Sequence, residues 1–422
     1  VSASLPICFV LAYRPPETVR LRAPRVESLP YFTHVTLEQL TASEAEQLIR
    51  AKLAQLFPSR TGPLPQILVS QLTARAEGNP FYIEELLNYL RDRDISLDDD
   101  DVVHSLELPV SLHALILSRI DRLSEAQKAA LKAASIIGRL FSLIWLHGYY
   151  PALGSIDTIK AELIELAQLD LTPLDMPEPE LTYLFKHIVT REVAYESLTY
   201  ATRAQLHEQL ARFIETQDAD RYLDLLAFHY DLSNNTAKQR RYLQQAGEAA
   251  LATFANQTAI DYFVRLLPLL DDPDAQLELH LKLGTVLQLM GQLPEAEAEY
   301  RAALVTSEQV QDRAATARCR RALGTLSSLR GDFSSALVWL EQARDTFATL
   351  DDQAELALTL IKLGGVWELK GEYVKSRQEL ETGLALALAL ADKPAAALAL
   401  NRFCLLYTSP SPRDGLLSRM PS

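Results

Sequence analysis

Cysteine is almost absent from this sequence, which has three in 422 residues. Cys8, Cys319 and Cys404 stand too far apart for metal-ligand spacing or for a disulfide framework. A reducing compartment is the simplest inference, so we expect a cytoplasmic protein. Long apolar runs are also lacking. The longest near the start, Leu5–Tyr13, is about half the length of a membrane span and follows no basic segment, which argues against a membrane anchor and a secretion signal.

Glycine is also scarce, and the chain has no net positive charge. The 15 glycines contrast with abundant Ala, Leu, Glu and Gln, a mixture that favours helices. The formal net charge of −14 disfavours binding to a phosphate backbone, which depends on Lys and Arg, so no nucleic-acid partner is expected. The chain is too long for one compact core, and we expect a mainly α fold with about two to four domains.

The stretch Arg75–Leu90 contains two helical patterns separated by a turn, Gly78-Asn79-Pro80. Gly78 can end a helix in the left-handed region at little cost. Pro80 has a fixed φ and no N–H, which suits the first turn of the next helix. The residues after it place apolar side chains at helical spacing. Taken as an isolated tripeptide, Gly-Asn-Pro predicts a helix-to-helix turn and nothing more.

In its context, GNPFYIEELL resembles the GxP turn in the helical lid of the signal-transduction ATPases with numerous domains (STAND), a branch of the AAA-like P-loop NTPases. The form is close to that of bacterial predicted ATPases with tetratricopeptide repeats, often fused to class III adenylate or guanylate cyclases or to protein kinases. In that family the proline packs on the adenine ring. The resemblance implies that role for Pro80, with Gly78 and Asn79 forming the turn around it.

The same resemblance extends to the start of the chain. Leu5–Tyr13 is continuous and apolar, which predicts a buried strand. In the family, this strand follows the Walker B strand, and its terminal arginine senses the γ-phosphate. Arg14 is the matching residue, and residues 1–26 would be a remnant of the P-loop core. The alternative for Arg14 is a solvated arginine at a strand end.

A second matching stretch is FKHIVTREVAYESL, Phe185–Leu198. In the family, a histidine at this place closes over the β-phosphate of ADP in the inactive form. The resemblance implies that role for His187. The alternative is a histidine whose hydrogen bonds are satisfied within the domain core.

The sequence has no GxxxxGK[ST] motif and no strand that ends in a Walker B acidic pair. Without them, phosphoryl transfer lacks its main electrostatic stabilisers. The resemblance implies ATP or ADP with Mg²⁺ as the cofactor of a longer parent protein. This fragment is not expected to hold nucleotide tightly or to hydrolyse it.

Residues 27–104 are predicted to form the helical lid. The capping box Thr41–Glu44 begins one helix, and Leu64–Ala76 forms a second, before the turn at Gly78. The four aspartates Asp98–Asp101 predict a solvated loop rather than a cation site, because neighbouring side chains cannot all converge on one ion.

Residues 105–200 are predicted to form a winged-helix domain. A short helix is expected at Phe141–His147, and strands at about Leu169–Leu174 and Leu181–His187 around an acidic tip. The helix that would enter a DNA groove, Ser155–Gln168, has one lysine against three acidic residues. Base-reading helices need the opposite charge, so this domain is not expected to bind DNA.

Residues 201–403 contain an internal repeat with a step of 40 residues. A weaker copy around Gly247 precedes it. Small residues at fixed places predict helical hairpins whose two helices touch, with large apolar residues filling the seam. The pattern resembles tetratricopeptide repeats, although their usual period is about 34 residues, so longer helices or linkers are expected. The repeat is marked by Gly284, Gly324, Gly364, Gly291, Gly331, Gly371, Tyr300, Leu340 and Leu380.

A fifth repeat begins near Leu398, after which three prolines interrupt the pattern. Residues 404–422 resemble translated adapter sequence and are expected to be a non-native tail. In that case the natural protein continues beyond about residue 403.

The favoured hypothesis is a regulatory or sensor fragment of a STAND-type ATPase. Its lid and winged helix would gate ATP and ADP, and its α-solenoid of TPR-like hairpins would bind a protein or small-molecule ligand on the concave surface. Oligomerisation on activation is left open. The alternatives are a repeat scaffold with no nucleotide dependence and a fragment of a transcription regulator. No catalytic arrangement of side chains is predicted within the fragment.

Overall fold

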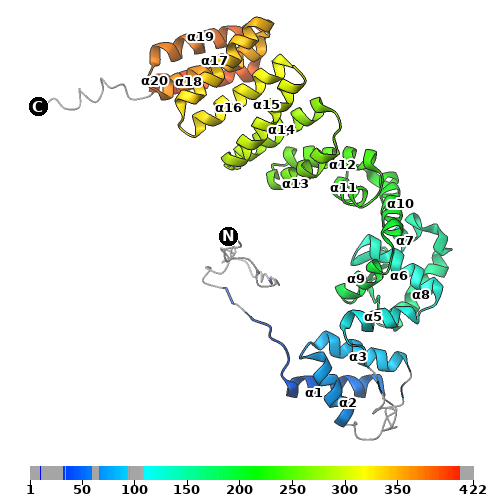
Figure 1. Ribbon diagram of the computed structural model, residues 1–422. Helices are drawn as coiled ribbons and strands as arrows, with labels where there is room; N and C mark the ends of the chain where they lie inside the picture. Colours follow the sequence, from blue (N-terminus) through cyan, green and yellow to red (C-terminus); the bar gives the residue numbers. More distant parts are fainter. Residues whose placement is uncertain are drawn as a thin grey trace, which may run out of the picture. The chain divides into compact units, whose positions relative to one another are not determined.

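The computed structural model describes residues 35–58, 66–93, 108–177 and 179–408, together with residues 10, 32, 33, 95 and 106 (Figure 1). Arg14 and, apart from Val10, the strand predicted over Leu5–Tyr13 lie outside the described residues. The chain divides into two compact units. Unit 1 comprises Val1–Lys128, Glu162–Pro173 and Phe185–Ala194, and unit 2 comprises Ala129–Ala161, Leu174–Leu184 and Tyr195–Ser422.

The helices at the start of unit 1 lie close to the positions that the sequence predicts. The capping box between Thr41 and Glu44 is present, and it satisfies two orphan N–H groups at the start of the first helix. The first three helices pack against one another, and the fourth packs on the third, around a buried apolar core. These helices are α1 (Ala42–Leu56), α2 (Gln66–Ala76), α3 (Pro80–Asp92) and α5 (Leu112–Asp121).

The next segment, which contributes to both units, combines short helices with three short strands. The strands form an antiparallel sheet of order β1-β3-β2. The elements are α6 (Glu125–Ile137), β1 (Leu140–Ser142), α7 (Leu143–Tyr149), η3 (Pro151–Leu153), α8 (Ile156–Gln168), β2 (Leu174–Met176), β3 (Thr182–Leu184) and α9 (Ile188–Glu196).

The strand positions differ in part from the sequence prediction. Strand β3 lies within the predicted range, but β2 begins at Leu174, where the predicted strand was to end. The stretch expected to be a helix from Phe141 begins as strand β1, and the helix starts only at Leu143. A three-residue strand shows no period of its own. Its conformation is set by its partner, because Phe141 pairs with Tyr183 in β3 and the two rings stack at 6.1 Å.

The rest of unit 2 is an α-solenoid of helical hairpins, as the repeat predicts, and the hairpins follow one another in chain order (Figure 1). Four successive first helices start at Pro273, Arg313, Gln353 and Lys393, a constant step of 40 residues. The helices are α10 (Tyr200–Asp218), α11 (Leu223–Asp231), α12 (Thr236–Ala252), α13 (Asn256–Leu266), η4 (Leu267–Leu269), α14 (Pro273–Leu289), α15 (Leu293–Gln309), α16 (Arg313–Leu329), α17 (Phe333–Leu350), α18 (Gln353–Leu369), α19 (Tyr373–Ala389) and α20 (Lys393–Thr408).

The long repeat step comes from the helices and not from the linkers. Helices α14, α15 and α16 have 17 residues each, and both turns between them are short. The turn within each of the hairpins α14–α15, α16–α17 and α18–α19 uses a glycine in the left-handed region, as at Gly291 and Gly331. The turn between hairpins places a non-glycine residue there, as at Gln311 and Asp351.

The glycines inside the first helices let the two helices of each hairpin touch. A Cβ added at Gly284 would lie 2.4 Å from the Tyr300 ring, and one at Gly324 would lie 2.7 Å from Cγ of Leu340. Such distances are far inside van der Waals contact. The prediction that small residues form the contact between the two helices, and that large residues fill the seam, is therefore confirmed.

Helix α20 continues to Thr408, so the first residues of the segment predicted to be a non-native tail are helical. Among the described helices, none combines the length and the apolar character that a membrane span requires.

Candidate functional site

The turn Gly78-Asn79-Pro80 has the backbone geometry that its residue types favour. Gly78 has a φ of 76°, and a Cβ at this position would lie 2.5 Å from the backbone oxygen of Leu40. The Asn79 side chain caps α3 by accepting hydrogen bonds from the N–H groups of Phe81 and Tyr82. Pro80 is the first residue of α3. Each residue of the turn therefore has a structural reason to be there.

The turn also presents a surface. Gly78 is buried, whereas the side chains of Asn79 and Pro80 are exposed. Asn79 lines a pocket of about 610 Å³, together with Arg75, Glu77 and Tyr82. This volume lies within the usual range for small-molecule sites. Pro80 is not among the residues that line it.

His187 lies directly beside α3. The centroid of its ring is 3.7 Å from that of Phe81, and the two planes are inclined by 37°. Its Nε2 atom is 3.7 Å from a carboxylate oxygen of Glu84, one helical turn further along α3. The structure thus brings together the two stretches on which the family resemblance rests, GNPFYIEELL and FKHIVTREVAYESL.

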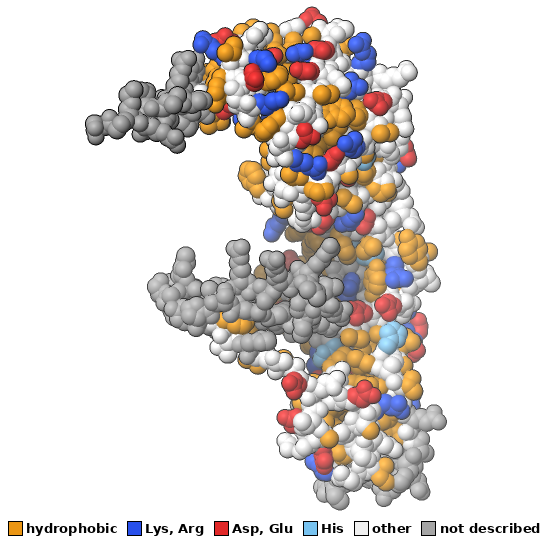
Figure 2. All heavy atoms as spheres, turned by 60° about the vertical axis from the view of Figure 1, so that its left-hand side comes forward, with side chains coloured by type: hydrophobic (Ala, Val, Ile, Leu, Met, Phe, Trp, Pro, Cys, Tyr) orange, Lys and Arg blue, Asp and Glu red, His pale blue; other side chains and the backbone are white. Residues whose placement is uncertain are grey.

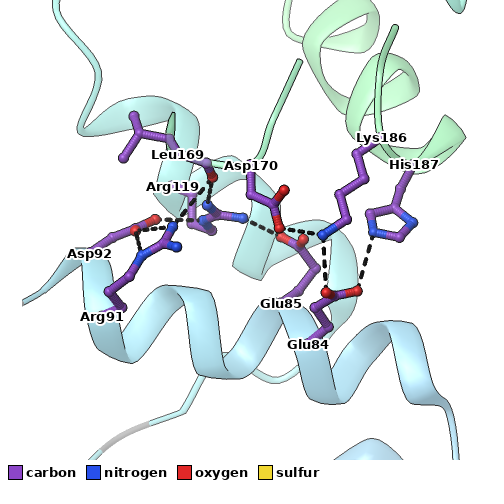
Figure 3. A network of polar contacts seen from close by, with 9 residues as sticks. All are labelled: Glu84, Glu85, Arg91, Asp92, Arg119, Leu169, Asp170, Lys186 and His187. Atoms are coloured by element: carbon purple, nitrogen blue, oxygen red, sulfur yellow. Dashed lines mark hydrogen bonds and ion pairs between the residues drawn. The ribbon is translucent and has the colours of Figure 1, made fainter. Parts of the chain in front are cut away.

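Glu84 is the centre of a group of charges beside His187 (Figure 3). One carboxylate oxygen accepts hydrogen bonds from Nζ of Lys52 at 2.8 Å and from Nζ of Lys186 at 3.0 Å. Lys186 also pairs with Asp170. Burial raises the pKa of Glu84, but the two lysines outweigh this effect and bring that pKa down to about 2.

The lowered pKa predicts that unit 1 loses stability in acid. Since the folded-state pKa lies below the unfolded-state value of 4.5, the stabilisation is complete above pH 4.5 and is lost as the pH falls towards 2. We expect Glu84→Gln to remove on the order of 1–2 kcal/mol at pH 7, allowing for solvent screening, and to flatten this pH dependence. Hydrogen exchange of α3 peptides between pH 7 and pH 3 measures both effects.

Glu46→Gln is the matched control, because Glu46 forms an exposed pair with Arg50 on α1. It should change the exchange of α3 much less. Equal pH dependence in Glu84→Gln and the unmodified protein would show that Glu84 does not carry the effect.

A second charged cluster is more deeply buried, and the sequence analysis missed it (Figure 3). The Arg119 guanidinium donates to Glu85 at 2.5 Å, to Asp92 at 2.7 Å and to the backbone oxygen of Leu169 at 2.6 Å. Arg91 also donates to the Asp92 carboxylate and to the backbone oxygen of Leu169. The side chains of Arg119 and Glu85 are each 1% exposed. Burial raises the pKa of Glu85, and the positive charge of Arg119 opposes that shift.

One signal in the sequence could have revealed this cluster. The apolar face of α3 includes Tyr82, Leu86 and Tyr89. Glu85 lies three residues after Tyr82 and four before Tyr89, so it belongs to the same face. A carboxylate on an apolar helix face requires a buried cation. Nothing near Glu85 in the sequence indicates that Arg119 supplies it.

Of the predicted site residues, Gly78, Asn79, Pro80 and His187 therefore lie in unit 1 around the start of α3, and Arg14 lies outside the described residues. Among the described residues, no group of His, Cys, Asp and Glu side chains forms a metal site.

Two segments match known protein families. Residues 276–348 match the tetratricopeptide repeat family. Residues 41–104 match a domain of unknown function (DUF8739), which falls within the range predicted to be the lid. No curated protein matches the chain.

Several solved structures are similar to the chain. A Signal Transduction ATPase with Numerous Domains (STAND) protein with a tetratricopeptide repeat sensor, from Pyrococcus horikoshii, is 14% identical with a TM-score of 0.35, and the match covers 89% of this chain and 58% of that protein. Aspartyl phosphate phosphatase F from Bacillus subtilis is 12% identical with a TM-score of 0.41, covering 85% and 84%. BtubC (BKLC) from P. vanneervenii is 18% identical with a TM-score of 0.36, covering 48% and 86%. These weak similarities say nothing about activity.

Proposed function

We propose that this chain is the regulatory part of a STAND-type signal-transduction ATPase. In this proposal, the turn at Pro80 and the side chain of His187 contribute one wall of a pocket for ATP or ADP with Mg²⁺. The P-loop that completes the pocket belongs to a longer parent protein. The repeats bind a protein or small-molecule ligand, and this binding shifts the balance between the ADP-bound and ATP-bound forms. The tetratricopeptide match at residues 276–348 supports the partner-binding half of the proposal.

The contact between Phe81 and His187 is the main observation that supports a nucleotide pocket in this proposal. The two residues belong to separate stretches that each resemble the ATPase family, and their side chains meet. Pro80, next to Phe81, is exposed and available to an adenine ring.

The charges around His187 are compatible with a phosphate. Glu84 alone would repel it, but Lys52 and Lys186 pair with Glu84, and Lys186 also pairs with Asp170. The two carboxylates are thus balanced by two lysines. His187 can then donate an N–H to a phosphate oxygen of a bound nucleotide.

The test uses the full-length protein with its upstream segment restored. We expect Pro80→Ala and His187→Ala each to weaken ADP binding about tenfold, the effect of one lost contact of about 1.4 kcal/mol. Isothermal titration calorimetry measures the two affinities. Pro273→Ala is the matched control, because Pro273 is the first residue of α14 as Pro80 is of α3. Unchanged ADP affinity in both variants would reject the proposed roles.

A repeat scaffold without nucleotide dependence is the second candidate. It is favoured by the fact that Gly78, Asn79 and Pro80 each have a structural reason to occupy the turn. This candidate predicts no ATP or ADP binding by the full-length protein at all.

A further inference from the structure

Four successive hairpins, from α12–α13 to α18–α19, share one kind of turn between their two helices. In each turn, a residue with positive φ donates its N–H to the carbonyl three residues earlier, and the next N–H donates to the carbonyl five residues before it. This pair of hydrogen bonds is the Schellman motif, which usually places glycine at the position of positive φ. The residues at that position are Phe254, Gly291, Gly331 and Gly371.

Phe254 therefore occupies a place where the three later hairpins have glycine. Its φ is 59°, a conformation that glycine adopts freely and that strains a bulky side chain. Packing within the chain does not offset this strain, because the Phe254 side chain is 86% exposed. A strained residue with an exposed aromatic ring is a candidate contact for a partner.

The three later hairpins each have an exposed leucine beside the same turn. Leu289, Leu329 and Leu369 are the last residues of α14, α16 and α18, at a step of 40 residues. They are 72%, 59% and 52% exposed. Single exposed leucines are ordinary, but four large apolar side chains at the same end of successive hairpins form a regular row. We call the row of Phe254, Leu289, Leu329 and Leu369 the apolar edge.

The turns of the apolar edge have no net charge. Arg330 and Asp332 balance each other in one turn, and Lys370 and Glu372 balance each other in the next. The turns at residues 253–255 and 290–292 are uncharged. Figure 2 shows hydrophobic side chains at the surface of the repeats, with basic and acidic side chains interspersed between them. Since the whole chain has a net charge of −14, two copies repel each other less along this edge than elsewhere.

The regular spacing of the row favours a second copy of this chain as the partner. Two identical rows that run in opposite directions stay in register over all four hairpins, because the hairpins repeat the same geometry. A two-fold axis between the second and third hairpins generates this arrangement. Phe254 then faces Leu369 of the second copy, and Leu289 faces Leu329 of the second copy.

The charges of the turns favour the same antiparallel direction. In this pairing, the charged turn at 370–372 faces the uncharged turn at 253–255, and the charged turn at 330–332 faces the uncharged turn at 290–292. Parallel rows in register would instead place like charges opposite each other. Lys370 also comes close to the Phe254 ring of the second copy, where a cation–π contact is favourable.

We propose that two copies of this chain associate in antiparallel fashion through the apolar edge, with the Phe254 ring as the main contact. This inference goes beyond the proposed function, because the association needs neither nucleotide nor an upstream segment. Four partly exposed side chains supply only part of the roughly 800 Å² that each partner buries in a standard interface. The dimer should therefore be weak, with a Kd in the micromolar range.

The first test is sedimentation velocity of the whole chain over a wide concentration series. We expect a monomer–dimer equilibrium, and Phe254→Gly should weaken the dimer about tenfold or more. The same substitution should leave Tm unchanged or raise it, because it relieves the backbone strain. Ala391→Gly is the matched control. Ala391 has a φ of 55° in a turn between hairpins, so its replacement relieves a similar strain and removes no ring.

A second pair of variants compares the two ends of one hairpin. Leu329 ends α16 at the apolar edge, whereas Leu350 ends α17 at the opposite end of the same hairpin and is 38% exposed. Leu329→Ser should weaken the dimer, and Leu350→Ser should leave it unchanged.

Cross-linking tests the antiparallel direction. All variants contain Cys8→Ser and Cys404→Ser, and Cys319 is buried. A short bis-maleimide should link a copy with Ala255→Cys to a copy with Glu372→Cys. It should not link Ala255→Cys to Gln292→Cys, the matched control, because residues 292 and 372 occupy equivalent places in their hairpins.

The remaining outcomes would each overturn the inference. A chain that stays monomeric at every concentration would exclude the dimer. A dimer that resists both Phe254→Gly and Leu329→Ser would lie elsewhere. Species that keep growing with concentration would contradict a closed two-fold pairing, and a link between residues 255 and 292 would contradict its direction. A clear fall in Tm with Phe254→Gly would assign the ring a structural role instead.

Discussion

Replacing Arg119 with alanine is expected to destabilise unit 1 by about 3–5 kcal/mol, because it leaves the carboxylate of Glu85 buried without its cation. Asp92 would keep its pair with Arg91, so Glu85 carries most of the cost. The backbone oxygen of Leu169 also loses its shorter hydrogen bond. A loss of this size is comparable to a large part of the stability of an ordinary domain.

The two units can be followed separately in the intact chain. The three tryptophans, Trp145, Trp339 and Trp367, all belong to unit 2, so tryptophan fluorescence in urea reports on that unit. Hydrogen exchange of peptides from α3 and α5 reports on unit 1. Arg119→Ala should accelerate exchange in unit 1 and leave the fluorescence transition nearly unchanged.

The double variant Arg119→Leu with Glu85→Leu is the control for this explanation. It removes both buried charges and fills the space with apolar groups, so it should recover most of the lost stability. If the double variant is as unstable as Arg119→Ala, then packing around the guanidinium matters more than its charge.

Replacing Gly78 with alanine is expected to destabilise unit 1 by about 2–5 kcal/mol. The left-handed φ of 76° costs a residue with a side chain about 1–2 kcal/mol. The overlap of its Cβ with the backbone oxygen of Leu40 adds a cost typical of overpacking, about 1–3 kcal/mol. The neighbour is backbone and cannot move aside as a side chain would. Exchange of peptides from α1 and α3 measures the effect.

Gly331→Ala separates these two contributions. Gly331 has a similar φ of 81°, but a Cβ there meets nothing within 4 Å. Its cost, measured by tryptophan fluorescence in unit 2, should be about 1–2 kcal/mol, the price of the backbone conformation alone. Equal costs at the two glycines would mean that the contact with Leu40 relaxes freely.

Local patterns were sufficient to predict much of this fold. The capping box at Thr41, the turn at Gly78 and the hairpins marked by Gly284 and Tyr300 could all be predicted from spacing. Each depends on residues within a few positions of one another or within one hairpin. Because the same pattern recurs at a constant step, a signal that is weak in one hairpin could be recognised over several copies. Strand β1 was not predicted, because three residues are too few to show an alternation of buried and exposed side chains. Its partner strand, β3, also lies far along the chain.

The charged and functional contacts depended instead on which helices pack together. Arg119 reaches Glu85, and His187 meets Phe81, through packing between elements that are distant in sequence. An ion pair or ring contact requires atoms within about 4 Å, whereas sequence patterns specify only the face of a helix on which a side chain lies. The amino-acid order therefore decided the helices, their caps and their repeat. The pairing of charges across those helices was decided by the tertiary structure.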